Sequence, residues 1–464
     1  MEYGMALRTR TGPRAPIWKI LLAISALTIA TAEAAPTESA APAPAAIRSA
    51  LQAMLEHPSA QATKGLRVAE LKRFYQARDF RPAWIGNPAA GVAAMALESA
   101  AADGLDPAAY HVSALATHKP LCTAERAARY DMVLTDGLLR YAHDLRRGLV
   151  DPAKADKMVG INRPSFDPVR SLETALKSGD IRAWLAGLAP TDPQYARLKR
   201  ALARYREAVV DGGWPKVPAV KKIEWKPGNP ELVPLERRLA LEDSTLRAAA
   251  PVGIPALKAA VKRFQARNGL EADGVVGRQT IAALNAPPTA RVARIEANME
   301  RWRWLPHRFP PRYIAVNAAD ATLKVVDKGK IVLTSRVIVG KRTTPSALFN
   351  AKVIAITVNP PWDVPASIVR NEIGPKMRRN PAYLTRHHMV QMGSPNRIRQ
   401  LPGADNALGY LKLEMPNRFT AYLHDTASRS LFQRDERHRS HGCIRVQNTA
   451  PGLVCAHGKP GIRA

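Results

Sequence analysis

The hydrophobic pattern of this chain changes once, near Pro311, and that change most constrains what the chain can fold into. Before it, apolar residues recur at the spacing of one helix face, as Ile47, Leu51 and Leu55 do. After it, short runs rich in β-branched residues, beginning at Tyr313, are separated by turn residues. At 464 residues the chain exceeds one ordinary core. The sequence therefore predicts a multidomain α+β protein, helical first and β-rich last.

Composition and breaks in periodicity suggest domain boundaries. Residues 35–46 are rich in Ala and Pro, and the Pro- and Lys-rich stretch from Trp214 to Pro230 interrupts the helical pattern. We expect a signal peptide over 1–34, a linker over 35–46, a helical scaffold domain over 47–231, a small three-helix module over 232–286, a connecting helix over 287–312 and a β-rich domain over 313–464. A basic, helix-like insertion from Ser367 to Tyr383 interrupts the last domain and is expected to flank a cleft.

The N-terminus has the order of a secretory signal. Basic residues up to Lys19 precede an apolar run that begins at Ile20, and Ala32 and Ala34 supply small residues at cleavage-type positions. This pattern predicts a periplasmic protein. The run is short for a membrane span, and an uncleaved signal anchor or peripheral membrane association is the alternative.

The chain is strongly basic, with 69 Lys and Arg against 39 Asp and Glu and a formal charge of +30. Such a surface is either simply solvated or meets a polyanion. Because the chain carries an export signal, we expect anionic envelope polymers and no nucleic acid as partners.

Three cysteines are present, so no disulfide framework holds an exported chain of this size together, and at least one thiol stays unpaired. Cys122 is interpreted as a buried helical thiol or an unpaired leftover. Cys455 and His457 are interpreted as residues of the C-terminal tail.

Two segments place polar residues on common faces of predicted strands. In residues 419–424, alternation puts Thr420, Tyr422 and His424 on one side. In residues 440–446, it groups His441, Cys443 and Arg445. These two polar faces are expected to line one pocket.

A cysteine nucleophile needs a nearby base, because a thiol of pKa near 8.5 is only a few per cent ionised at neutral pH. His424 is the candidate base for Cys443. Gly442 leaves room for a peptide carbonyl beside the sulfur and for main-chain N–H groups that stabilise an oxyanion. Arg445 has the geometry to bind a carboxylate. From the residues alone, a buried structural thiol remains the alternative.

The segments from Tyr422 to Thr426 and from Ser440 to Arg445 resemble the signature of the L,D-transpeptidase family with a YkuD-type catalytic domain. Similarity extends over residues 301–306, 339–341, 359–365 and 405–409. Residues 261–285 resemble the small peptidoglycan-binding domain found beside many cell-wall enzymes. With its helical N-terminal region, the chain resembles the large Gram-negative members.

The resemblance implies that Cys443 is acylated and that His424 is its general base. His441 would support this pair indirectly. Main-chain N–H groups around Gly442 and Cys443, assisted by Tyr422, would bind the oxyanion. Ser440, Tyr422 and Arg445 would contact substrate. The implied reaction releases D-Ala from a tetrapeptide stem of peptidoglycan and forms a 3→3 cross-link, without metal or organic cofactor. Peptidoglycan peptides and glycan are the implied partners, and carbapenems the implied covalent inhibitors.

Three alternatives stay open. A zinc site would use His424, Cys443, Cys455 and His457, although their spacing fits no familiar zinc pattern. The ending from Pro451 to Ala464 differs from the family's usual continuation, which leads us to expect a truncated catalytic domain and allows an impaired wall-binding protein. The same acyl-enzyme would also serve water, as in an L,D-carboxypeptidase, or a lipoprotein lysine.

Overall fold

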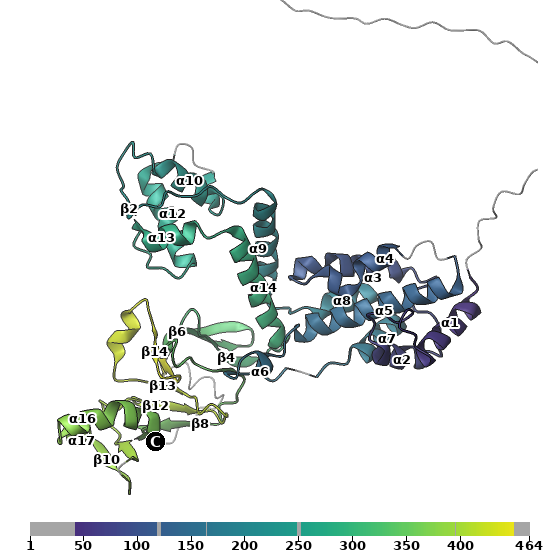
Figure 1. Cartoon of the computed structure of the whole chain (residues 1–464). Coiled ribbons are helices and arrows are strands. Elements are labelled where there is room, and N and C mark those ends of the chain that lie inside the picture. Colours follow the sequence, from purple (N-terminus) through teal and green to yellow (C-terminus); the bar gives the residue numbers. More distant parts are fainter. Residues whose placement is uncertain (1–41, 118–121, 164, 248–251, 395, 450–464) are drawn as a thin grey trace, which may run out of the picture. The chain divides into compact units, whose positions relative to one another are not determined.

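The computed structural model describes residues 42–117, 122–163, 165–247, 252–394 and 396–449. The described chain is helical in its N-terminal part and β-rich in its C-terminal part, with a small helical module between them in the sequence (Figure 1). The predicted α+β class is therefore confirmed. The predicted signal peptide and C-terminal tail lie outside the described residues.

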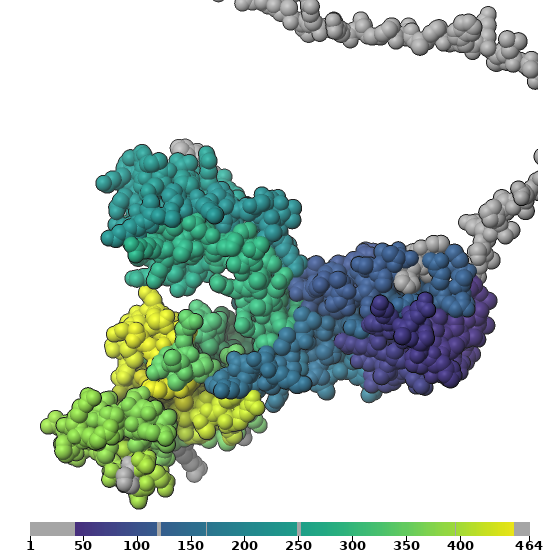
Figure 2. Space-filling view, viewed as in Figure 1, coloured from purple at the N-terminus to yellow at the C-terminus, as the bar shows by residue number. Residues whose placement is uncertain are grey.

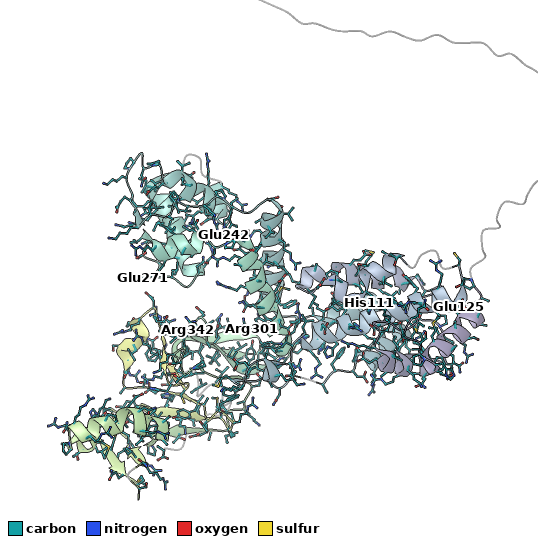
Figure 3. All side chains as sticks on the ribbon, in the orientation of Figure 1. His111, Glu125, Glu242, Glu271, Arg301 and Arg342 are labelled. Atoms are coloured by element: carbon teal, nitrogen blue, oxygen red, sulfur yellow. The ribbon has the colours of Figure 1, made fainter. Side chains whose placement is uncertain are left out.

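The helical domain is organised around the 24-residue helix α5 (Ala124–Arg147), which is buried along most of its length. Inside it, the carboxylate of Asp131 accepts N–H bonds from Ala83, Trp84 and Ile85. His111, labelled in Figure 3, lies with Nε2 2.6 Å from Oδ2 of Asp136 on the same helix. Buried acids thus fix the loops around α5, because a buried carboxylate must be hydrogen-bonded.

Shorter helices surround α5 and share one apolar core with it. They are α1 (Pro44–Glu56), α2 (Val68–Gln76), α3 (Ala89–Glu98), η1 (Ser99–Asp103), η2 (Pro107–Tyr110), α4 (Val112–Thr117), α7 (Pro168–Ser178) and α8 (Ile181–Leu188). This part of the chain also contains α6 (Pro152–Ala155) and α9 (Pro193–Val210). Cys122 is exposed and precedes α5, so its interpretation as a buried helical thiol is wrong.

The small module has its own core, formed by α10 (Leu232–Ala240), α11 (Ser244–Arg247), α12 (Ile254–Arg267) and α13 (Arg278–Leu284). Strands β2 (Lys222–Ile223) and β3 (Val276–Gly277) pair antiparallel. Val217 and Ile223 are buried in this core. The stretch from Trp214 to Pro230, which the sequence suggests is a connector, therefore contributes to the module. Helix α14 (Pro288–Trp304) follows and packs on α9 through Ile295 and Met299.

The C-terminal domain is built on a mixed sheet with the order β4-β5-β6-β15-β13-β12-β8, in which β14 also pairs with β6. These strands are β4 (Arg312–Asn317), β5 (Thr322–Asp327), β6 (Lys330–Gly340), β8 (Ala355–Val358), β12 (Leu411–Glu414), β13 (Leu423–His424), β14 (His438–Ser440) and β15 (Ile444–Val446). A further strand, β7 (Leu348–Phe349), pairs in parallel with β1 (Val159–Gly160), and η4 (Arg429–Gln433) lies between β13 and β14. An apolar core that includes Leu413, Leu423 and Ile444 covers one face of the sheet.

Residues 362–400 form a separate lobe inserted in this domain. It contains β9 (Trp362–Asp363), α15 (Ala366–Ile368), η3 (Val369–Ile373), α16 (Gly374–Arg379), α17 (Tyr383–Arg386), β10 (Met389–Gln391) and β11 (Ile398–Gln400). The three strands pair in the order β10-β11-β9, and Val364, Val369, Ile373 and Ile398 form the lobe's own core. Figure 2 shows most of this lobe as a light-green body. The predicted insertion is thus helical, and strands flank it.

Both predicted motif strands are shorter than expected. Of residues 419–424, only Leu423 and His424 are a strand, because Thr420 has φ +51° and Asn417 accepts N–H bonds from Phe419 and Ala421 in a turn. Residues 440–446 are divided between the end of β14 and the start of β15, with Gly442 at φ +124° between them. The prediction of two continuous strands is therefore wrong.

Candidate active site

A row of polar residues crosses one face of the sheet. Register pairs Lys412 with His424 and His424 with Arg445 on neighbouring strands β12, β13 and β15. Paired residues of adjacent strands point to the same face. The next row, Leu413, Leu423 and Ile444, belongs to the apolar core on the other face. The ends of β13 and β15 thus bring the predicted His424 and Arg445 together despite the errors in strand length.

Cys443 stands directly before β15, beside Tyr422. The N–H of Ile444 donates to the Tyr422 carbonyl at 3.1 Å, which continues the parallel pairing of β13 and β15 backwards. Burial raises the pKa of the Cys443 thiol above its ordinary value. Hydrogen bonds from Tyr422 and the charges of Lys412 and Arg445 partly oppose that rise. The resting sulfur is therefore a neutral thiol at pH 7, held where cations favour its ionisation.

His424 is buried, with 4% of its surface exposed. Burial and then the charge of Arg445 lower the pKa of its imidazole from 6.5 to about 3, while the carbonyls of Asp425 and Leu408 partly oppose this. Nδ1 is buried and has no hydrogen-bond partner in the described ranges. In a neutral ring with its proton on Nε2, Nδ1 carries the lone pair and can accept a proton.

His424 is the last residue of β13 and pairs with Arg445, whereas Cys443 lies two residues before Arg445, just outside β15, and no direct hydrogen bond between His424 and Cys443 is present. Between them, the ring of Tyr422 stands edge-on to that of His424, with centroids 5.4 Å apart. The structure thus places the two predicted residues on neighbouring segments of one sheet, with Tyr422 beside both of them.

Hydroxyl groups hold the loop that carries the cysteine. Ser440 donates through Oγ to the Cys443 carbonyl at 2.5 Å and accepts the Gly442 N–H at 3.1 Å. Ser346 donates to the Gly442 carbonyl at 2.6 Å, and Thr344 donates to the Ser440 carbonyl at 3.2 Å. Ser440, expected to contact substrate, is only 2% exposed and is used inside the loop.

Two side chains of the lobe contact the site, one at the cysteine loop and one at Tyr422. Nε2 of His441 lies 2.6 Å from Oε1 of Glu372 in η3. Trp362 in β9 hydrogen-bonds to the hydroxyl of Tyr422, although burial and the neighbouring Cys443 still raise the pKa of this tyrosine. His441 therefore faces the lobe, and the predicted insertion does border the cysteine loop.

Sequence reasoning missed several of these residues, although signals existed for some. Glu372 is the only acidic residue between Ser367 and Tyr383. Lys412 lies in a short run of alternating polar and apolar residues, and its apolar neighbour Leu413 is part of the core. Ser346 and Thr344 gave no signal, because their role depends on a loop that approaches from a distant part of the chain.

A metal site was the alternative hypothesis for His424 and Cys443. In the described part of the chain, no group of three or more His, Cys, Asp or Glu side chains is arranged to hold a metal ion. Cys455 and His457, the other two residues of that hypothesis, lie outside the described residues.

Comparison with known families assigns the class of each region. Residues 311–452, which contain the sheet, the lobe and the cysteine loop, match the L,D-transpeptidase catalytic domain. Residues 69–202 match the Scaffold domain, and residues 253–284 match the "Putative peptidoglycan binding domain". The predicted resemblance to scaffold-bearing L,D-transpeptidases is therefore confirmed, with the three regions in the expected order.

At the level of whole proteins, the chain is 34% identical over 196 residues to a protein of Haemophilus influenzae named "Putative L,D-transpeptidase". The matched region is 37% of this chain and 40% of that relative, so the chain spans about two fifths of the relative's length. Separately, none of the helices in the described ranges combines the length and hydropathy of a membrane span.

Proposed function

We propose that this protein is an L,D-transpeptidase in which Cys443 is the nucleophile and His424 the general base. The observation that carries the proposal is the unpartnered, buried Nδ1 of His424 on the sheet face that leads to Cys443. A buried nitrogen without a partner is costly, and its retention is explained if it accepts a proton during the reaction. The match of residues 311–452 to the transpeptidase domain supports the same chemistry.

In the acylation step, the Cys443 sulfur attacks the carbonyl of the third residue of a tetrapeptide stem. The thiol proton passes to Nδ1 of His424, a C–S bond forms, and the carbonyl oxygen becomes an oxyanion. The C–N bond to D-Ala then breaks, and the imidazolium returns the proton to the leaving amine. The products are a thioester on Cys443 and free D-Ala, so that atoms and charge balance.

The raised thiol pKa and the low imidazole pKa make the resting pair neutral. With both groups neutral at rest, proton transfer to His424 would accompany attack by the sulfur. The charges of Arg445 and Lys412 would stabilise the sulfur as it ionises.

Lys412 is tied to Glu414 at 3.0 Å, whereas the Arg445 guanidinium has no hydrogen-bond or ion-pair partner in the described chain. Arg445 is thus the residue free to bind a stem carboxylate.

In the second step, a side-chain amine of another stem attacks the thioester and gives a 3→3 cross-link. His424 takes the amine proton, and the sulfur recovers it on leaving. Water in place of the amine would release a tripeptide stem, as in an L,D-carboxypeptidase. The same acyl-enzyme precedes both outcomes, and the acceptor decides between them.

The other regions fit this activity in the cell wall. The module around residues 253–284 would bind peptidoglycan glycan, and the signal at residues 1–34 would deliver the protein to the periplasm, by cleavage or as a membrane anchor. Carbapenems would acylate Cys443, because their strained carbonyl meets the same nucleophile.

The deciding experiment incubates the purified protein with a disaccharide-tetrapeptide and follows the products by mass spectrometry. We expect loss of D-Ala and a cross-linked dimer from the unmodified chain, and neither from Cys443→Ala or His424→Ala. A tripeptide without dimer would identify a carboxypeptidase. If Cys443→Ala gave as much product as the unmodified chain, the mechanism would be excluded. If the unmodified chain gave no product, the alternative of a non-catalytic wall-binding protein would be favoured.

A further inference from the structure

Three consecutive peptide groups surround Cys443, and each is held by a hydroxyl or a strand bond. Ser440 accepts the N–H of Gly442 at 3.1 Å and donates to the Cys443 carbonyl at 2.5 Å. The peptide between Gly442 and Cys443 is held differently, because its carbonyl accepts a hydrogen bond from Ser346, at 2.6 Å, and from no other described residue. The N–H of that peptide donates to no group in the described ranges.

In a trans peptide, the carbonyl and the N–H point in opposite directions. The bond from Ser346 to the Gly442 carbonyl therefore also fixes the direction of the Cys443 N–H. That N–H is aimed away from Ser346. An unpaired main-chain N–H next to a nucleophile has the chemistry of an oxyanion donor.

The conformation of Gly442 explains why the direction of this peptide has to be fixed. At φ +124° it occupies a conformation that glycine reaches easily and other residues rarely do. A peptide next to such a glycine can turn over at little cost, and turning would point a carbonyl oxygen at the developing oxyanion. The Ser346 hydroxyl opposes this rotation from outside the loop.

Ser346 itself is held from the other side. Its Oγ accepts the N–H of Gly340 at 2.9 Å, at the end of β6. It belongs to the turn after β6, on which Figure 3 labels Arg342. A Cβ at Gly340 would collide with the backbone of Thr344 and Ser346, so the turn lies close against the strand. One hydroxyl thereby ties the sheet to the peptide that precedes the nucleophile.

We propose that Ser346 is a positioning residue that sets the Cys443 N–H as the oxyanion donor by holding the Gly442 carbonyl. This inference rests on the proposed function and adds to it a residue outside both motif segments. Ser346 acts through the peptide and contacts no reacting atom.

The test compares Ser346→Ala with a matched control, Ser335→Ala. Ser335 is a buried hydroxyl of the same domain that donates to the Arg336 carbonyl at 3.1 Å and accepts the Asn448 N–H at 3.2 Å, away from the cysteine loop. Two rates are measured for each protein: acylation by the tetrapeptide stem, which forms an oxyanion, and alkylation by iodoacetamide, which does not.

For Ser346→Ala we expect kcat for acylation to fall about tenfold to a hundredfold, somewhat less than for outright removal of an oxyanion donor, with KM nearly unchanged. Alkylation should stay at the unmodified rate, Ser346→Thr should recover most of the acylation, and Ser335→Ala should keep both rates. A parallel loss of alkylation would indicate a collapsed loop and overturn the proposal, as would an unchanged acylation rate.

A readout independent of activity separates this proposal from the proposed function. Labelling with 15N-cysteine gives amide signals from three residues. The signal that disappears in Cys443→Ala is that of Cys443. Ser346→Ala should shift or broaden the Cys443 amide signal, whereas Ser335→Ala should not. An unmoved signal would refute the positioning role. If Ser346→Ala shifts the Cys443 amide signal but the unmodified protein never forms an acyl-enzyme, the positioning role of Ser346 is supported and the transpeptidase proposal fails.

Discussion

Nε2 of His441 lies 2.6 Å from Oε1 of Glu372, and this pair joins the cysteine loop to the inserted lobe. The two residues are 69 positions apart, and both side chains are partly exposed, at 37% and 43%. An exposed pair of this kind contributes little to global stability. Its effect should therefore be local, on how firmly the lobe and the loop stay together.

Glu372→Ala should loosen the lobe without unfolding the protein. We expect the free energy of unfolding to change by less than about 1 kcal/mol, because the pair is solvent-screened. Hydrogen–deuterium exchange should increase in η3 (Val369–Ile373) and in the cysteine loop. The matched control is Glu436→Ala, which removes a similar exposed partner of His438 at 2.9 Å. Equal exchange in both variants would mean that the pair does not fasten the lobe.

The buried imidazole of His424 predicts an acid-labile domain. The folded chain protonates this ring only near pH 3, whereas the unfolded chain does so near 6.5, so the unfolded state binds more protons between these values. The free energy of unfolding must therefore fall as the pH drops from about 6.5 to about 3. This one ring accounts for about 4 to 5 kcal/mol at most of that loss.

His424→Gln should flatten that part of the stability profile. Urea unfolding at pH 7, 5.5 and 4.5 would measure the slope in both proteins. His307, whose pKa is lowered to about 4 by burial and by Arg146, acts in the same direction and should keep a residual slope. An unchanged slope in His424→Gln would show that the ring is not a buried neutral base.

Tyr422→Phe should make Cys443 less reactive. The tyrosine hydrogen-bonds to the sulfur and lowers the pKa of a thiol that burial has raised. Removing the hydroxyl should raise that pKa further and slow iodoacetamide alkylation at pH 8, with the rate still rising with pH. Tyr410→Phe, which alters a tyrosine that is 49% exposed in the same domain, is the control. Faster alkylation in Tyr422→Phe would contradict the assigned hydrogen bond.

The sequence identified the candidate site residues, whose catalytic roles stay predictions, but not the local geometry around them. Alternation grouped Cys443 with Arg445, and the resemblance to the L,D-transpeptidase signature singled out Cys443 and His424. The ends of β13 and β15 do place His424 and Arg445 on one face. The strand lengths were wrong, because the alternation of residues 419–424 gives no sign that Asn417 organises a turn there.

Partners from distant segments were beyond the reach of local patterns. Ser346 and Glu372 come from the turn after β6 and from the lobe, and only the tertiary fold brings them to the cysteine loop. In the helical domains, by contrast, the periodicity was sufficient. Ile47, Leu51 and Leu55 are all buried in α1, because a helix face is defined by neighbours in the sequence.

Gly442→Ala separates backbone strain from crowding at the cysteine. A Cβ at this position would meet only the Pro345 carbonyl oxygen, at 3.7 Å, so space is available. The φ of +124° is nevertheless unfavourable for alanine, and we expect a loss of about 1 to 3 kcal/mol in the free energy of unfolding unless the peptide turns. A turn would move the Cys443 N–H and reduce acylation.

Gly329→Ala is the control for that substitution. Gly329 also has a positive φ, +76°, with nothing within 4 Å of an added Cβ, and it lies in the turn between β5 and β6. Both variants should lose stability in urea unfolding, Gly329→Ala the less, because its φ lies near the left-handed region that other residues sometimes adopt. Only Gly442→Ala should lose acylation. If Gly329→Ala lost acylation equally, the effect would follow from weakened folding, and the backbone at Gly442 would have no special part in catalysis.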